Sequence, residues 1–142
     1  MTVNVTRDIA IATVANIPSK SQNLSEILSR IADIGVDIDM ISQSVPQGDK
    51  INLSFSLPQR ELGKILEISK IFKKISPSIS TEINGYNAKI TFRSEKANYE
   101  IGSAAGIFRE FNRLGIFVKM ISTAESEISC IIDENDAKRF KF

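Results

Sequence analysis

The chain has 142 residues, a formal net charge of +1 and 42% hydrophobic residues, which fits one globular domain or two small ones. It contains no histidine and no tryptophan, so a histidine base, a Ser–His–Asp triad and a histidine-ligated metal are excluded. The near-neutral charge gives no general attraction to nucleic acid, and no apolar run is long enough to span a membrane. The start of the chain lacks the pattern of a secretory signal, so we expect a cytoplasmic protein.

The first 35 residues predict two short strands followed by a helix. Residues 2–6 and 9–15 alternate as strands, and Arg7-Asp8 is expected to break them. A polar loop over residues 16–23 follows, and Asn23 has the side chain of a helix N-cap. The helix is expected to end at Gly35, because glycine accepts a left-handed backbone without a Cβ clash. One apolar stripe at helical spacing supports it: Leu24, Ile27, Leu28, Ile31 and Ile34.

A hairpin is predicted next. Residues 36–44 and 50–57 read as two strands, and the turn residues Pro46-Gln47-Gly48-Asp49 stand between them.

A second helix and a fourth strand complete the first half of the chain. Pro58 can open the helix, where its missing N–H costs little, and Pro77 stops it. Residues 79–83 alternate as a strand that is expected to end at Asn84-Gly85. The helix carries a broad apolar face: Leu62, Ile65, Leu66, Ile68, Ile71, Phe72 and Ile75.

The second half predicts a similar series of elements. Residues 86–93 read as a strand, a helix ends at Gly115, and strands follow at residues 116–122 and 127–132. Residues 135–140 are expected to be a short helix. The single cysteine, Cys130, excludes an internal disulfide and lies in an apolar alternating stretch, which predicts a buried side chain. The helical stripe before Gly115 consists of Ile107, Phe108, Phe111 and Leu114.

The strongest signal is a duplication. The segment Gly35–Ser42 returns as Gly115–Ser122, and in both copies a helix, a glycine and two strands occur in the same order. The first copy reads as β-α-β-β-α-β, whereas the second lacks its fourth strand. Because an unpaired sheet edge favours aggregation, we predict that the spare strand at residues 2–6 completes the second sheet. The alternative, a disordered amino-terminal tail, is less favoured. The expected domains are 8–85 and 86–142 together with 1–7.

Three segments resemble the regulatory region of aspartokinase, which is a pair of ACT domains. Residues 35–44, GVDIDMISQS, resemble that family's G-I-N-V-D-M-I-x-Q-S. Residues 120–130, MISTAESEISC, resemble M-I-S-T-S-E-I-K-I-S-C, and residues 102–108 are similar to G-V-A-A-K-M-F. The resemblance implies an α+β fold of two ferredoxin-like ACT domains with antiparallel sheets and helices on one face. In that family the first domain is inserted into the second, which agrees with the predicted strand exchange.

The same resemblance implies where a ligand binds. ACT domains of this kind bind amino acids at the turn between strand one and helix one, against strand two of another ACT domain. A helix start suits the carboxylate, because its free backbone N–H groups carry partial positive charge. No metal or cofactor is implied. The implied first site consists of Ser21, Gln22, Asn23 and Leu24, facing Asp39, Met40 and Ile41. The implied second site consists of Gly102, Ser103 and Ala104, facing Ile121 and Ser122.

Several of these residues have structural interpretations too. Asn23 can act as a helix cap, a ligand contact or both, and Asp39 can be solvated or hold a ligand's ammonium group. Met40 and Met120 are expected to fill the core. Gly102 stands where the family has the glycine of a Pro-Gly pair. The first turn has no such glycine, so the two turns differ.

Two functions remain open at this stage. One is an amino-acid-binding allosteric module, of the lysine or threonine class by resemblance, acting in a homodimer. The other is a ligand-free assembly subunit that docks on a separate kinase chain. The altered first turn favours the second function and the retained Gly102 disfavours it. We expect no catalytic activity, because neither a counterpart of the kinase domain nor a Gly-rich phosphate loop is present. The chain could be a subunit or a fragment of an aspartate kinase.

Overall fold

The chain forms two compact units in the computed structural model, which describes residues 2–94 and 103–140. The first unit is residues 10–85, and the second unit is residues 1–9 together with residues 86–142. The strand order of the sheet is β2-β3-β1-β4-β6-β5. Strands β1 and β4 belong to both units, so each unit has four strands in the same topological order. The α+β fold predicted from the sequence is confirmed.

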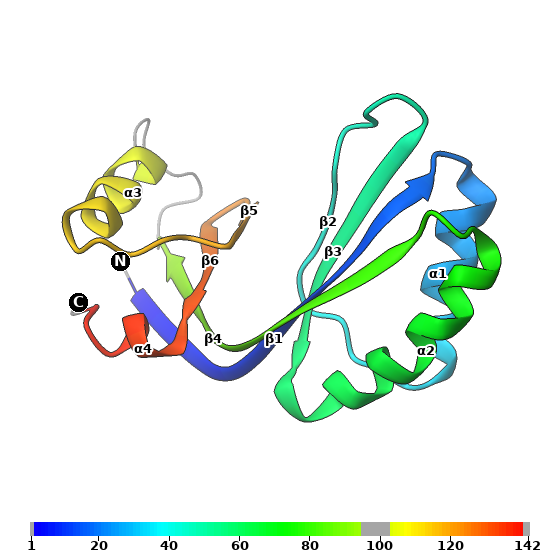
Figure 1. The fold of residues 1–142 in the computed structure, drawn as a ribbon. Coiled ribbons are helices and arrows are strands. Elements are labelled where there is room, and N and C mark those ends of the chain that lie inside the picture. Colours follow the sequence, from blue (N-terminus) through cyan, green and yellow to red (C-terminus); the bar gives the residue numbers. More distant parts are fainter. Residues whose placement is uncertain (1, 95–102, 141–142) are drawn as a thin grey trace. The chain divides into compact units, whose positions relative to one another are not determined.

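The first unit places two helices on one face of its sheet (Figure 1). Strands β2 and β3 pair antiparallel, with Ile41 opposite Phe55 and Gln43 opposite Leu53. Its elements are β1 (Thr2–Pro18), α1 (Ser21–Asp33), β2 (Ile41–Gln43), β3 (Lys50–Pro58), a short 3-10 helix (Gln59–Glu61), α2 (Leu62–Ile75) and β4 (Ser80–Arg93).

The core of the first unit lies between this sheet and the two helices. Alternate residues of β3 point into it, as the period of a strand requires. The stripes of α1 and α2 cover them from the other side. Its largest fully buried side chains are Phe55, Phe72, Ile17, Ile27, Ile31, Leu53, Leu57, Ile65 and Ile79.

The second unit has one long helix and one short helix. Strand β4 pairs antiparallel with β6, which places Ile90 opposite Cys130 and Phe92 opposite Ile128. The Asp133 side chain accepts a hydrogen bond from the backbone N–H of Asn135 at 2.9 Å and so caps α4. Its further elements are α3 (Ser103–Arg113), β5 (Met120–Ala124), β6 (Glu127–Asp133) and α4 (Glu134–Ala137).

The amino-terminal strand belongs to the second unit, as predicted. Residues 1–9 group with residues 86–142, and β1 is the neighbour of β4 in the sheet. The side chains of Val3 and Val5 pack against the core of the second unit. The less favoured alternative, a disordered tail, is therefore excluded for Thr2 and the residues after it.

Two predicted strand breaks do not occur. Strand β1 continues through Arg7-Asp8, and β4 continues through Asn84-Gly85. At each predicted break one residue takes a left-handed conformation instead, with φ of 58° at Asp8 and 60° at Tyr86. A single such residue in a strand makes a local kink without ending the pairing. Residues that usually mark turns therefore bend these strands rather than end them.

Several element boundaries also differ from the predictions. The helix α1 begins at Ser21, inside the predicted loop 16–23, and β2 is shorter than the predicted 36–44. The residues before β2 are still held by backbone hydrogen bonds, so its pairing extends beyond the named strand. The last helix ends at Ala137 and not at residue 140. Both predicted helix ends at glycine are confirmed, with φ of 73° at Gly35 and 69° at Gly115.

Within residues 2–94 and 103–140, no helix is long and apolar enough to cross a membrane.

Candidate functional site

The first candidate turn is short and tightly hydrogen-bonded. Strand β1 ends at Pro18, and α1 starts three residues later at Ser21. The backbone N–H of Ser19 donates to the Asp49 carbonyl at 2.8 Å, and the Lys20 N–H donates to the Pro18 carbonyl at 2.7 Å. The first bond holds the turn against the hairpin between β2 and β3, and the second lies within the turn.

Asn23 is not the N-cap that the sequence predicts. The N-cap residue is Lys20, and no side chain caps this helix. Asn23 lies in the first turn of α1 and its Nδ2 donates to the Pro18 carbonyl at 3.0 Å. The Asn23 N–H donates to the Lys20 carbonyl at 3.0 Å, so the N–H groups of Ser21 and Gln22 are the ones left for solvent or an anionic group.

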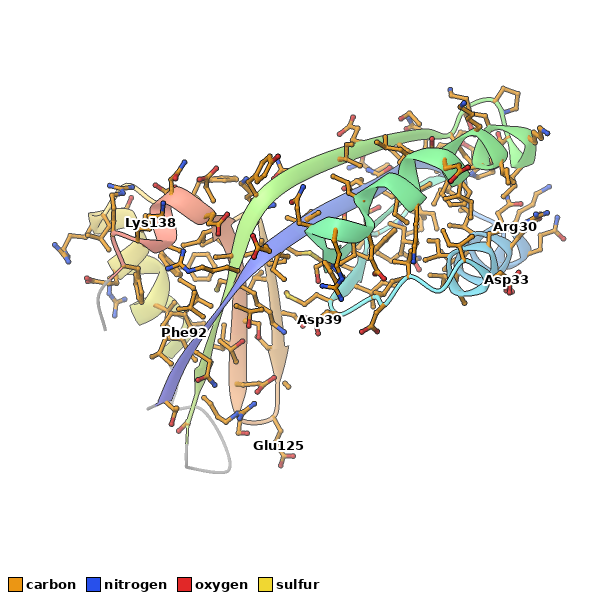
Figure 2. The ribbon with its side chains drawn as sticks, turned by 90° about the horizontal axis from the view of Figure 1, so that it is seen from below. Arg30, Asp33, Asp39, Phe92, Glu125 and Lys138 are labelled. Carbon is orange, nitrogen blue, oxygen red and sulfur yellow. The ribbon has the colours of Figure 1, made fainter. Side chains whose placement is uncertain are left out.

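The segment proposed to face this turn is fixed by a buried serine. The Met40 N–H donates to Ser56 Oγ at 2.9 Å, the Asp39 N–H donates to the Ser56 carbonyl at 3.1 Å, and the Ser56 N–H donates to the Met40 carbonyl at 2.9 Å. Met40 is buried, as predicted, whereas the Ile41 side chain is 49% exposed on the edge strand β2. Asp39 is exposed and lies in the segment that leads into β2 (Figure 2).

The two predicted sets of the first unit do not meet within that unit. Strand β3 separates β2 from β1 in the sheet order. Of three cavities among the described residues, one is lined by Gln22 and Asn23, and none of these three is lined by Asp39, Met40 or Ile41. The first unit alone therefore does not bring the two sets together.

The second candidate turn is described only in part. Gly102 lies outside the described residues, α3 begins at Ser103, and Ala104 is exposed. On the facing strand β5, the Ile121 side chain is 42% exposed and Ser122 is exposed, whereas Met120 is buried as predicted. Strand β5 is an edge strand like β2, so both units present a facing strand at a sheet edge.

A polar cavity near the first turn was missed by the sequence analysis. It has a volume of about 220 Å³ and is lined by five polar side chains: Asn16, Ser44, Gln47, Lys50 and Asn52. The Asn16 N–H donates to Asn52 Oδ1 at 2.9 Å, and the Asn52 N–H donates to Ser44 Oγ at 2.9 Å. Asn16 adopts a left-handed φ of 59°, which costs free energy for a residue with a side chain. The wall combines amides and a hydroxyl with the Lys50 ammonium, which lies 3.5 Å from the Asp49 carboxylate.

No sequence signal pointed to this cavity because its residues come from three separate segments. Asn16 lies near the end of β1, Ser44 follows β2, and Lys50 and Asn52 belong to β3. Only the turn residues around Gln47 gave a sequence signal, and that signal predicts a hairpin turn and not a cavity.

The described residues offer little for covalent or metal chemistry. Burial raises the pKa of the Cys130 thiol to about 12, so the nucleophilic thiolate is not formed near neutral pH. Among residues 2–94 and 103–140, no group of three His, Cys, Asp or Glu side chains is placed to hold a metal ion.

Comparison with known proteins links this architecture to the ACT domain and to aspartokinases. Residues 94–139 match the model of the ACT domain. An aspartokinase from Bacillus sp. (strain MGA3) is 28% identical over 128 residues, which cover 90% of this chain and 31% of the relative. A structure of aspartokinase alpha and beta subunits is 29% identical, with a TM-score of 0.84 over 95% of this chain and 88% of that chain. The chain resembles the ACT regulatory region of aspartokinase.

A second structure supports the same fold. The regulatory subunit of aspartate kinase from Thermus thermophilus has a TM-score of 0.86 at 22% identity, covering 98% of this chain and 91% of that subunit. The chain spans about a third of the length of the curated aspartokinases it matches, whereas it covers nearly all of the solved regulatory subunit.

Proposed function

We propose that the chain is an amino-acid-binding allosteric module of an aspartate kinase, built from two ACT domains with boundaries 8–85 and 86–142 together with 1–7. The observation that carries this proposal is the similarity to aspartokinase alpha and beta subunits across nearly the whole chain. The catalytic activity would belong to a kinase region in the same protein or in a separate chain. We place the module in the cytoplasm, where a free cysteine such as Cys130 stays reduced.

The effector in this proposal is a small amino acid of the lysine or threonine class. Its carboxylate would bind the uncapped start of α1, around Ser21, Gln22, Asn23 and Leu24. Its ammonium group would bind the exposed carboxylate of Asp39, with Met40 and Ile41 supplied by the edge strand of another ACT domain. The polar cavity lined by Lys50 and its neighbours lies beside this turn, and its amides and hydroxyl suit a hydroxyl side chain of the threonine class, whereas the Lys50 ammonium would repel a lysine side chain.

The equivalent site of the second ACT domain would use Gly102, Ser103 and Ala104 with Ile121 and Ser122 of an edge strand. An effector bound between two domains stabilises whichever arrangement binds it more tightly, and this differential affinity is the source of the regulation. A homodimer of this chain would supply the second ACT domain that each site needs.

A panel of the twenty amino acids tests the proposal by thermal unfolding. A ligand present at a hundred times its dissociation constant stabilises the folded state by about 2.7 kcal/mol, which raises the unfolding temperature by several degrees. We expect this rise for one or two amino acids, saturating with concentration. The variant Asp39→Asn should lose the response, and the control Asp37→Asn, an exposed carboxylate two residues earlier, should keep it.

A ligand-free assembly subunit is the second candidate function. The first turn lacks the glycine found at the second, which favours this function for the first unit. It predicts no response to any amino acid, together with co-purification of a kinase chain from the source organism. A selective response that Asp39→Asn leaves intact would exclude both the assembly role and this placement of the effector.

A further inference from the structure

The start of α2 is joined to the segment that leads into β2. Glu61 is the N-cap residue of α2, but its side chain makes no capping bond to its own helix. Instead, Glu61 Oε2 accepts a hydrogen bond at 3.2 Å from the backbone N–H of Asp37, which lies 24 positions earlier in the chain. The Glu61 side chain is only 14% exposed. An N-cap side chain usually accepts from an N–H of its own first turn, so this carboxylate serves another segment.

The backbone from Asp37 to Met40 is held at both ends by one short stretch, residues 56–61. Glu61 holds the N–H of Asp37. At the other end, the Met40 N–H donates to Ser56 Oγ at 2.9 Å, and the Asp39 N–H donates to the Ser56 carbonyl at 3.1 Å. The Asp39 side chain therefore projects from a backbone that is fixed on both sides.

The second unit keeps the backbone bond of this arrangement and changes the side chains. Its Lys119 N–H donates to the Ile131 carbonyl at 2.8 Å, as the Asp39 N–H does to Ser56. Ile131 therefore stands at the place of Ser56 and has no hydroxyl group. The N-cap residue of α4, Asp133, caps its own helix. In the described part of the chain, the side-chain attachments thus belong to the first unit, where a carboxylate stands at the position that Lys119 occupies in the second.

We propose that Glu61 is a positioning residue for the binding of the effector by Asp39. This inference rests on the proposed function, in which the Asp39 carboxylate binds the effector's ammonium group. A carboxylate on a backbone that is already fixed binds more tightly, because less conformational entropy is lost on binding. Release of Asp37 from Glu61 would leave one end of the segment unattached, while the Ser56 bonds at the other end remain.

The ion pair of Glu61 with Lys64 does not account for the direction of the carboxylate. Lys64 Nζ lies 3.7 Å from Glu61 Oε1, and the Lys64 side chain is 49% exposed, so this pair contributes little. The Asp37 N–H bonds to the other oxygen, Oε2. The two interactions can therefore be removed separately.

Calorimetric titration of the full chain with L-threonine, and separately with L-lysine, tests the inference. We expect Glu61→Ala to weaken binding of the amino acid that the wild type binds by about tenfold. Glu61→Gln should stay within about threefold of the wild type, because its side-chain carbonyl can still accept the Asp37 N–H. The control Lys64→Ala removes only the ion pair and should bind like the wild type.

A destabilised variant with an intact attachment separates positioning from stability. Ile65→Val removes one methylene group from the core of the first unit and should lower its unfolding temperature. It leaves the segment attached, so its affinity for the amino acid should not change. Hydrogen exchange at the Asp37 amide gives a second readout: exchange should be faster in Glu61→Ala and return toward the wild-type rate in Glu61→Gln.

The outcomes distinguish this inference from the proposed function. A wild-type response that Glu61→Ala leaves unchanged, or that Ile65→Val weakens equally, would overturn the positioning role and leave the proposed function standing. Equal losses in Glu61→Ala and Glu61→Gln would assign the effect to the charge of Glu61 and would overturn it as well. A wild-type chain that binds neither amino acid would contradict the proposed effector class itself, and the role of Glu61 would fall with it.

Discussion

The two units share one strand plan but fill it with different side chains. The first unit covers its sheet with two helices of 13 and 14 residues and has a core dominated by isoleucine and leucine. In the second unit the second helix is only the four residues of α4. Its core contains Phe92, Phe111 and Phe140, and the ring centroids of Phe111 and Phe140 lie 5.0 Å apart. Aromatic rings thus supply the volume that a longer helix supplies in the first unit.

The shared plan extends to single side chains away from the core. In the first unit, Thr13 and Ser54 join their hydroxyl groups at 2.9 Å across neighbouring strands. In the second unit, Thr91 and Ser129 do the same at 3.1 Å. The comparison shows that glycine helix ends and cross-strand hydroxyl pairs can persist in a duplicated fold while the apolar core residues change.

Removal of residues 2–6 should give the largest difference between the units. These residues close the sheet of the second unit and contribute Val3 and Val5 to its core. We expect the second unit to lose most of its stability, about 5 kcal/mol for so small a domain, while the first unit stays folded. Hydrogen exchange of β4 residues 86–93 and of β3 checks this. Equal loss of protection in both units would mean that they unfold as one.

Substitution of Phe111 should have the next largest effect. Its ring also lies within 6.1 Å of Phe92 and 6.4 Å of Phe108, so Phe111→Ala should cost the second unit about 3–5 kcal/mol. Phe111→Leu should still cost about 1–3 kcal/mol, because each aromatic pair contributes about 0.5–1.5 kcal/mol beyond its buried area. The matched change Phe72→Leu, in the aliphatic core, should cost less. Urea unfolding followed separately in each unit measures the difference, and equal costs would contradict an aromatic contribution.

Cys130 should make the stability of the second unit fall at alkaline pH. Burial raises its pKa from 9.0 to about 12, so between these values the unfolded chain releases a proton that the folded unit keeps. The stability supplied by the neutral thiol is therefore complete below pH 9 and falls as pH rises toward 12, by at most about 1.4 kcal/mol per pH unit. The difference in unfolding free energy between wild type and Cys130→Ala should follow this slope. A difference that stays constant with pH would contradict it.

Replacement of the left-handed residues should give the smallest effect. A left-handed backbone costs a residue with a side chain about 1–2 kcal/mol, and glycine removes this cost. Glycine also makes the unfolded chain more flexible, which lowers the net gain in stability by about 0.5–1 kcal/mol. Tyr86→Gly should therefore stabilise the chain by about 0.5–1 kcal/mol, and Asp8→Gly by less, because aspartate tolerates this conformation better. Thermal unfolding measures both changes. A larger gain at Asp8 would contradict this ranking.

The sequence predicted the plan of the fold because its signals are local. Gly35 and Gly115 end helices through a backbone conformation that glycine favours, and apolar periodicity marked the faces of α1, α2 and β3. The unbroken course of β1 and β4 could not be predicted, because Asp8 and Asn84-Gly85 usually interrupt a strand. Only pairing with strands on both sides, a long-range effect, carries the chain through them. Phe108 was predicted in the core stripe, but its side chain is 37% exposed.

The candidate site could be predicted only as separate segments. Met40 and Met120 were correctly assigned to the core. The prediction of Asn23 as the N-cap was wrong, because its amide donates to the Pro18 carbonyl and the helix starts at Ser21, before the first residue of its apolar stripe. The polar cavity around Asn16 and Lys50 depends on how the hairpin lies against the end of β1, which no periodicity encodes.

The course of β1 and β4 through both units gives the chain an order of assembly. Residues 2–9 can pair only after residues 86–93 have been synthesised. If the residues between them were unfolded, bringing these two segments together would close a long loop and lose considerable chain entropy. Folding of residues 10–85 removes most of that loss, because it already sets the neighbouring parts of β1 and β4 side by side. We therefore expect the first unit to act as the template on which the second unit is completed, late and at little entropic cost.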